Sequence, residues 1–292
     1  MGYALSRWGR WPKTVSDALT RFTFSVAIPA LLFRLMMDFR ALPAVDARLL
    51  IAYFGGSLLM FAVSRIVAAR AFGMDGVSQT IFAMGTIFSN NVLLGIPLAK
   101  IILGDASLPS VSLVVVFNSL TLWTLVTVSV EWARHGEVSL RGFAATARSV
   151  VLNPVVSSVL LGIAFSFTEL AMPRVATDTL GLLSQAAVPM SLIVLGMGLA
   201  EYGIGEGIAP SLVLSLLKLV AAPLLVYAIA RAIALPAVET QTVVMLASLP
   251  VGANVYIMAR QFGALQAPVA TSLVLTTALA ALTTPLLLVA IS

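Results

Sequence analysis

Residues 87–97 read IFSNNVLLGIP, and residues 247–255 read ASLPVGANV. Both stretches interrupt long apolar segments with Gly, Asn and Pro. A helix that crosses a bilayer must satisfy its own backbone hydrogen bonds, because lipid offers no partners. An interruption is therefore tolerated only where the freed backbone groups face protein or a wet cavity. Two such breaks at corresponding places of one chain are typical of a transporter's substrate site.

The composition assigns the chain to the membrane proteins. Its 292 residues are 60% hydrophobic and only 10% charged, whereas a soluble domain carries about 25% charge. Uncharged runs reach or approach the roughly 20 residues that are needed to cross the hydrocarbon core. The sequence predicts an all-α polytopic membrane protein with nine spans, at 16–37, 47–70, 77–103, 108–131, 145–168, 175–200, 208–232, 239–261 and 265–290.

Several classes of function are excluded by residue types. The net charge of +5 comes from basic residues scattered between the predicted spans, which are orientation signals and not a nucleic-acid surface. With no Cys and a single His, His135, in a charged loop, no disulfide or thiolate metal site is expected. The predicted spans hold almost no carboxylates for acid–base chemistry. We expect no enzyme, no catalytic residue, no cofactor and no bound metal.

An internal repeat accounts for the odd number of spans. Pro29 and Pro189 lie 160 positions apart, as do Gly2 and Gly162, and Asn91 precedes Asn254 by 163. The pattern predicts two five-helix repeats and no soluble domain, and the boundaries are a first repeat at 1–131, an inter-repeat loop at 132–144 and a second repeat at 145–292. The span at 145–168 has only residues 1–8 as its counterpart. Ten spans are thus expected and nine present, through a mis-assigned start or a truncation.

Repeats with an odd number of spans are inverted relative to each other. If the loops near 7–21, 65–75, 132–148, 201–207 and 260–264 are cytoplasmic, that side holds ten Lys and Arg residues. The opposite side then holds five: Arg40, Arg48, Lys100, Arg174 and Arg231. This distribution follows the positive-inside tendency, and it leaves the C-terminus outside.

The breaks predict a site for an anion. Pro97 suits the first turn of a half-helix that begins near Gly95 and runs to Leu103, and Asn254 is expected to cap a half-helix at 255–262. Helix N-termini offer free N–H groups and a partial positive charge. We expect a carboxylate-bearing substrate where the breaks cross, bound by Asn90, Asn91, Gly95, Pro97, Pro250, Gly252 and Asn254. The alternative is that Pro and Gly only kink two helices.

Three basic residues are candidates for gating or for steering an anion. Lys100 and Arg260 follow their breaks at similar distances, and the alternative for both is a long side chain that snorkels to the interface. Lys218 lies about ten residues into its span, between Leu217 and Leu219. A charge in that position suggests a functional group that alternates between charge states, or one that snorkels or pairs with a carbonyl.

The motifs resemble those of the auxin efflux carrier family, which includes bacterial permeases for malonate or malate. The resemblance covers nearly the whole chain. It rests on the Asn91, Gly95 and Pro97 break, on Asn153-Pro154, on the stretches 249–254 and 259–263, and on the early stretch 26–33. It implies ten spans in inverted repeats and two broken helices that cross in a mobile transport domain. Asn91, Pro97, Pro250 and Asn254 fall on that crossover, and Asn90 competes with Asn91 for one family position. The missing first span departs from the family pattern.

The resemblance implies a secondary permease for small organic anions such as malonate, malate or auxin-like acids, which works by alternating access in a bacterial inner membrane. A cation-coupled anion symporter of the bile-acid type and a non-transporting receptor or inactive paralogue are the alternatives. Coupling to protons or Na⁺ and a homodimer stay open. The expected partners are the anion and the lipid bilayer.

Overall fold

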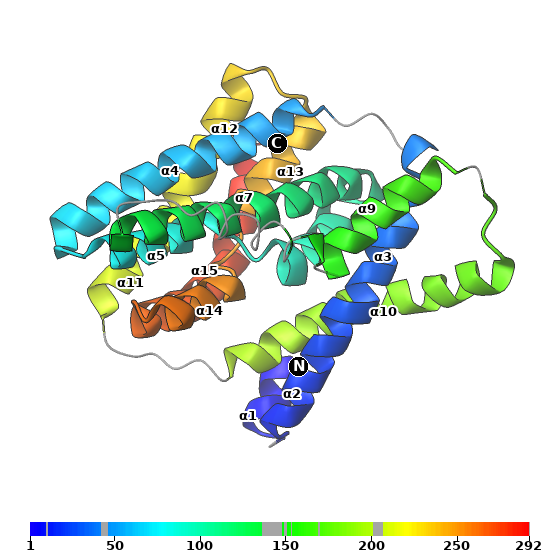
Figure 1. Cartoon of the computed structure of the whole chain (residues 1–292), viewed down its shortest axis with the longest axis horizontal. Coiled ribbons are helices and arrows are strands. Elements are labelled where there is room, and N and C mark those ends of the chain that lie inside the picture. Colours follow the sequence, from blue (N-terminus) through cyan, green and yellow to red (C-terminus); the bar gives the residue numbers. More distant parts are fainter. Residues whose placement is uncertain are drawn as a thin grey trace. The chain divides into compact units, whose positions relative to one another are not determined.

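A computed structural model describes residues 1–9, 11–41, 46–135, 148, 151–152, 154–168, 170–200 and 207–291 (Figure 1). The described part is helical, and its only β-type pairing is an isolated bridge between Ser89 and Val251. The chain folds into two compact units, which are residues 1–45, 92–119 and 148–201, and residues 46–91, 120–147 and 202–292. The expected inter-repeat loop lies outside the described residues beyond His135, as do Arg10, Arg141 and Asn153.

The first unit is built around one helix, α3 (Ile28–Met36), and the two helices that pack against it. Its elements are α1 (Gly2–Arg7), α2 (Lys13–Phe22), η1 (Thr23–Ala27), α3 (Ile28–Met36), η2 (Phe39–Ala41), α6 (Ile96–Leu98), η4 (Ala99–Leu103), η5 (Asp105–Ser107), α9 (Pro154–Ser166) and α10 (Arg174–Leu199). Helix α3 packs against both α9 and α10. The long helix α7 (Leu108–His135) begins in this unit and continues in the second.

The second unit holds most of the apolar core. Its elements are α4 (Arg48–Phe72), α5 (Gly76–Ile87), α11 (Ile208–Leu216), η6 (Leu217–Ala221), α12 (Ala222–Ala232), α13 (Ala237–Ser248), α14 (Ala253–Phe262) and α15 (Gln266–Ile291). The element η3 (Asn91–Gly95) begins here and passes into the first unit. Helix α4 packs along α5 and α12, and a buried apolar cluster joins α5, α7 and α14.

Three prolines each follow a widened π-helical turn. The turns η1, η3 and η6 end two residues before Pro29, Pro97 and Pro223. A proline inside a helix lacks the N–H for the i→i−4 bond, and its ring clashes with the carbonyl four residues earlier. A wider turn relieves that clash without ending the helix. The prolines therefore change the local pitch and leave the helices continuous.

The two glycines that matched in the sequence repeat lie at close helix contacts. A Cβ on Gly2 of α1 would meet the carbonyl oxygen of Ile193 on α10 at 2.0 Å. A Cβ on Gly162 of α9 would meet Met36 Cβ at 2.7 Å and the Phe33 carbonyl oxygen at 2.9 Å. Small residues let membrane helices approach closely enough to pack. Both glycines are required by packing within the first unit.

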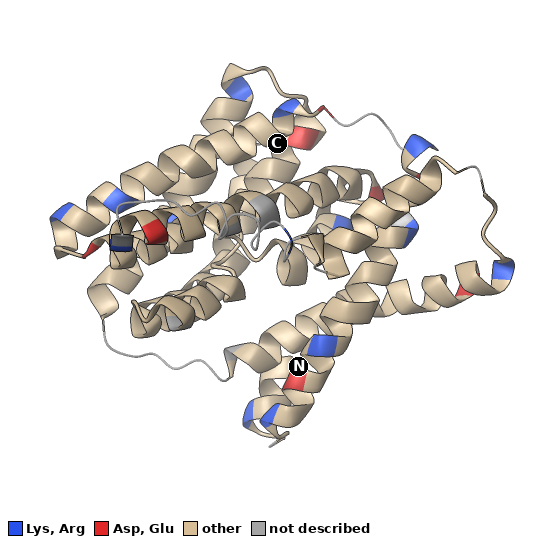
Figure 2. Cartoon of the chain, in the orientation of Figure 1, with Lys and Arg blue, Asp and Glu red and all other residues tan. Residues whose placement is uncertain are grey.

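Five described helical stretches are long and apolar enough to cross a membrane: Lys13–Arg34, Arg48–Phe72, Arg174–Gly198, Ile208–Ala232 and Gln266–Ile291. Most charged residues lie toward helix ends and loops, and the bodies of the long helices are largely uncharged (Figure 2). Large apolar side chains such as Ile51, Leu59 and Leu286 are exposed on these helices, as expected for surfaces that face lipid. The chain is an all-α polytopic membrane protein, as the composition predicted.

Candidate functional site

The two sequence breaks meet inside the second unit. Ser89 and Val251 form an antiparallel bridge. The backbone N–H of Asn90 donates to the Pro250 carbonyl at 3.0 Å, and the N–H of Gly252 donates to the Phe88 carbonyl at 2.8 Å. Phe88, Leu249 and Gly252 all have extended backbones. The breaks are therefore not simple kinks, because each supplies the hydrogen-bond partners that the other lost.

Further backbone groups at the crossing are also satisfied by protein. The N–H of Val251 donates to Thr276 Oγ1 on α15 at 3.1 Å, and that of Asn91 donates to the Ser89 carbonyl at 2.8 Å. Ser248 at the end of α13 is tied to Thr284 of α15 through two side-chain contacts. An open backbone in a bilayer needs this kind of internal pairing.

A helix starts immediately after each break, earlier than the sequence suggested. The first helical stretch runs over Asn91–Leu103, so it begins at Asn91 and not near Gly95. The second, α14, begins at Ala253 with Gly252 as its N-cap. The expectation that Asn254 caps a helix at 255–262 is therefore wrong. Asn254 lies in the first turn of α14 and is exposed, because the extended backbone ends two residues sooner.

The two adjacent asparagines of the first break have different surroundings. Asn91 is 2% exposed, and its Nδ2 donates to Tyr53 Oη on α4 at 2.9 Å. Within the described residues, Asn91 Oδ1 is buried without a hydrogen-bond partner. Asn90 is also buried and pairs through its backbone. Leaving a buried amide oxygen unpaired costs free energy. This oxygen is an acceptor, so any donation from Asn91 to an anion must come from the second N–H of its Nδ2.

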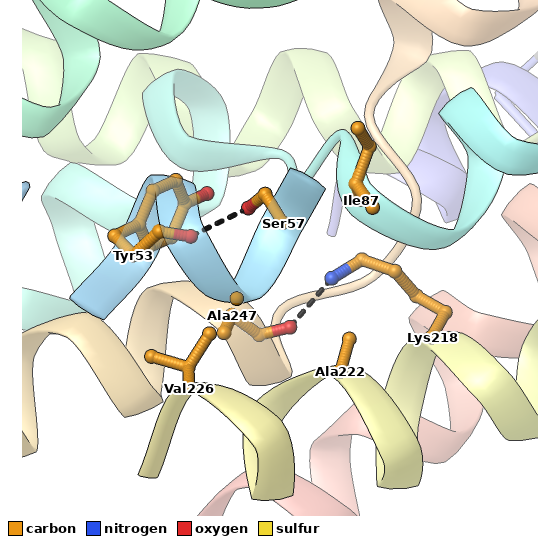
Figure 3. Close-up of a pocket in the computed structure, with 8 residues that line it drawn as sticks. Tyr53, Ser57, Ile87, Lys218, Ala222, Val226 and Ala247 are labelled. Atoms are coloured by element: carbon orange, nitrogen blue, oxygen red, sulfur yellow. Dashed lines mark hydrogen bonds between the residues drawn. The ribbon is translucent and has the colours of Figure 1, made fainter. Parts of the chain in front are cut away.

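Lys218 reaches the crossing from η6. Its Nζ donates to Ser89 Oγ at 2.8 Å and to the Ala247 carbonyl at 2.5 Å. The side chain is fully buried. Beside it lies a cavity of about 10 Å³, lined by residues of α4, α5, η6, α12 and α13: Tyr53, Gly56, Ser57, Ile87, Lys218, Ala222, Val226 and Ala247 (Figure 3). The sequence singled out Lys218 but could not assign its partners.

Asn254 is exposed on α14 of the second unit, and the other predicted site residues fall into two groups. Asn90, Asn91, Pro250, Gly252 and Lys218 come together in the second unit. Gly95 and Pro97 are buried in the first unit.

The two remaining basic candidates differ in how far the structure describes them. In the first unit, Lys100 forms an ion pair with Asp105 at 3.5 Å and lines a surface pocket with Arg34 and Asp38. Arg260 lies near the end of α14, and the structure does not describe its side chain.

Sequence reasoning missed two polar residues of the crossing. Ser89 lies within the quoted stretch, and its side chain accepts from Lys218. Tyr53 lies on α4, 38 positions before Asn91. Nothing local in the sequence links Tyr53 to the breaks, whereas Ser89 could have been noted as the one hydroxyl between two predicted helix halves.

Comparisons with known proteins agree with this architecture. Residues 1–288 match the model of a family described as "Membrane transport protein". The chain is 26% identical to a Rhizobium meliloti (strain 1021) protein named "Putative malonate transporter", over 97% of this chain and 89% of the relative. It is 27% identical to an "Uncharacterized transporter" of Methanothermobacter thermautotrophicus (strain Delta H), over 86% of this chain and 80% of the relative.

The family and these relatives point to transport and not to catalysis. The apolar helices of membrane length and the paired breaks fit that conclusion. The chain is therefore a multi-pass membrane protein that belongs to this membrane transport family, the auxin efflux carrier family.

Proposed function

We propose that this chain is a secondary permease for small organic anions, which binds a carboxylate at the crossed breaks and moves it by alternating access across a bacterial inner membrane. The observation that carries the proposal is the direct pairing of the two breaks, Asn90 with Pro250 and Gly252 with Phe88. This pairing brings the starts of two helices to one region of the second unit.

The chemistry at the crossing suits an anion. The first N–H groups of a helix have no intrahelical partners, and the N-terminus carries a partial positive charge. A carboxylate is a natural ligand for such ends. Asn254 is exposed in the first turn of α14, and its amide supplies further donors without the cost of a buried charge. The name of the Rhizobium relative makes malonate the first substrate to test.

The test is uptake of labelled malonate by proteoliposomes that contain the purified protein. We expect uptake above that of protein-free liposomes. Asn91→Ala and Asn254→Ala should each lower the initial rate about ten- to a hundredfold, since a hydrogen bond to a charged group contributes about 1.5–3 kcal/mol. Thermal shift with malonate, malate, lactate and aromatic acids identifies the preferred anion, because a specific ligand stabilises the folded state.

The matched control is Asn118→Ala. Asn118 is buried on α7 and, within the described residues, also has an unpartnered Oδ1. It lies outside the crossing, so its loss should leave uptake near the wild-type rate. If Asn91→Ala and Asn254→Ala both transport like wild type, the proposed site is wrong. If the protein neither carries nor binds any carboxylate, the proposed function is wrong.

A further inference from the structure

Lys218 is the one charged residue between Ile208 and Ala230. It lies in the widened turn η6, ahead of Pro223, and its side chain is 0% exposed. A charged group inside a membrane protein is costly and is usually retained for a function. The position of its ammonium group indicates what that function is.

The Lys218 ammonium connects the two breaks. Ser89, which accepts from it at 2.8 Å, belongs to the first break. Ala247, whose carbonyl accepts at 2.5 Å, lies in the last turn of α13, directly before the second break. Figure 3 shows the Lys218 side chain pointing between α5 and α13 toward that carbonyl. The partners recorded for Nζ in the described part of the chain are thus two uncharged oxygens.

These oxygens form an environment that favours a positive charge. The last carbonyls of a helix lack intrahelical partners, and a helix C-terminus carries a partial negative charge. Both α5 and α13 end at the crossing. In carriers with broken helices, such ends and unwound carbonyls coordinate the coupling cation. Hydroxyl and carbonyl oxygens are also the ligands that hard cations prefer.

The space beside the Lys218 side chain is small. The neighbouring cavity of about 10 Å³ corresponds to roughly one water-sized sphere. Tyr53, which lines it, accepts from Asn91 and also interacts with Ser89. Removing the lysine side chain would therefore leave a small chamber lined by a hydroxyl, a phenol and a carbonyl oxygen.

We propose that the Lys218 ammonium is a built-in cation, which occupies the place that a free Na⁺ or similar monovalent ion takes in a cation-coupled carrier. The cation site is inferred from the contacts of Lys218 alone. The further expectation, that transport needs no free cation, rests on the proposed function. The substitution Lys218→Ala should convert the site into one that binds a free cation.

The test compares Lys218→Ala with Lys218→Met, an uncharged side chain that fills most of the same space. Thermal unfolding in detergent is followed in NaCl, KCl and LiCl against choline chloride at equal ionic strength. We expect the wild-type midpoint to be the same in all four salts. At least one small cation should raise the Lys218→Ala midpoint by roughly 3–5 °C in a saturable manner, whereas Lys218→Met should not respond.

A second test of the proposal uses only the wild-type protein. Uptake by wild-type proteoliposomes should keep its rate when choline replaces Na⁺ on both sides. A wild-type protein that is stabilised by Na⁺ or needs it for uptake overturns the proposal. So does a folded Lys218→Ala protein that responds to no cation. Should Lys218→Ala fail to fold, Lys218→Ser replaces it with the same expectation.

The outcomes separate this inference from the proposed function. A cation response of Lys218→Ala together with no flux of any carboxylate supports the cation site and contradicts the permease. Carboxylate flux without that cation response supports the permease and overturns the role of Lys218.

Discussion

Gly252 occupies the tightest point of the crossing. A Cβ at this position would lie 3.1 Å from Phe88 Cδ1, 3.1 Å from the Ser89 carbonyl oxygen and 3.2 Å from that of Phe88. Its φ of −72° is open to any residue, so the requirement for glycine comes from space and not from backbone conformation. Two of the three nearest atoms are backbone atoms, which cannot turn aside as the end of a side chain can.

Gly252→Ala should therefore destabilise the protein. Forcing a methyl group into a packed site costs about 1–3 kcal/mol, and we expect that loss in the free energy of unfolding measured by denaturant titration in detergent. The control is Gly55→Ala on α4, where an added Cβ meets nothing within 4 Å. Ala is favoured over Gly in a helix by about 0.5–1 kcal/mol, so Gly55→Ala should be neutral or stabilising. Equal effects of the two variants would contradict the close approach of the breaks.

Single residues also show how far the sequence could predict the candidate site. Asn91 and Lys218 were recognisable because polar groups in apolar segments are costly. Tyr53 was not, since a tyrosine in a span has no local signal for its partner. Asn254 was misjudged as a cap because its side chain suits that role, while the extended backbone through Gly252 decides where the helix begins.

At the scale of elements, helix α5 is fixed at both ends. Its C-terminal end leads into the crossing, and its N-cap is Asp75, whose side chain accepts from the Ser78 N–H at 2.7 Å. The Ser64 and Thr86 hydroxyls, 2.8 Å apart, also tie α5 to α4. The position of Ser89 relative to Lys218 therefore depends on where α5 starts and how it docks.

Asp75→Ala should lower the free energy of unfolding by about 1 kcal/mol, within the range of 0.5–2 kcal/mol that is typical of a lost N-cap. Asp75→Asn keeps an oxygen acceptor and should stay close to wild type. The measurement is chemical unfolding in detergent near neutral pH. If the Asn variant loses as much stability as the Ala variant, the carboxylate charge matters and not the cap.

The long helices were the most predictable elements. The expected spans at 47–70 and 208–232 nearly coincide with Arg48–Phe72 and Ile208–Ala232, because charged residues lie near both ends of each apolar run. The breaks were predicted to exist and to cross, but the backbone hydrogen bonds that join them were not predicted. Hydrogen bonds between residues that are far apart in sequence depend on tertiary packing, which a local sequence pattern does not specify. The total of nine spans stays a prediction.

At the scale of the whole molecule, the predicted repeat stays a prediction, and two pairs of helices have spacings that can be compared with it. Helices α5 and α13 have 12 residues each, and their starts lie 161 positions apart (237 − 76). Arg48–Phe72 and Ile208–Ala232 have 25 residues each, and their starts lie 160 apart (208 − 48). Both offsets agree with those of the matched Gly and Pro residues. The inverted orientation and the repeat boundaries at 1–131 and 145–292 remain our proposal.

Inverted topology predicts which side of the membrane each loop faces. The chain has no Cys, so single cysteines report without background. Ala71→Cys, Gln261→Cys and Ala232→Cys change exposed residues near helix ends. An impermeant maleimide added to intact cells should label only the cysteine at 232, and permeabilisation should reveal the other two. Labelling of 71 and 232 from the same side would contradict the inverted arrangement.

The bridge between Ser89 and Val251 has a consequence for biogenesis. It joins residues that are 162 positions apart (251 − 89). At about 5–20 residues per second, a ribosome needs roughly 8–32 s to make the second partner after the first. During that interval Asn90 and Phe88 lack the carbonyl and N–H that later pair with them, and lipid offers no substitute. We therefore expect water, the insertion machinery or a temporary helical conformation to satisfy these groups until the second half emerges.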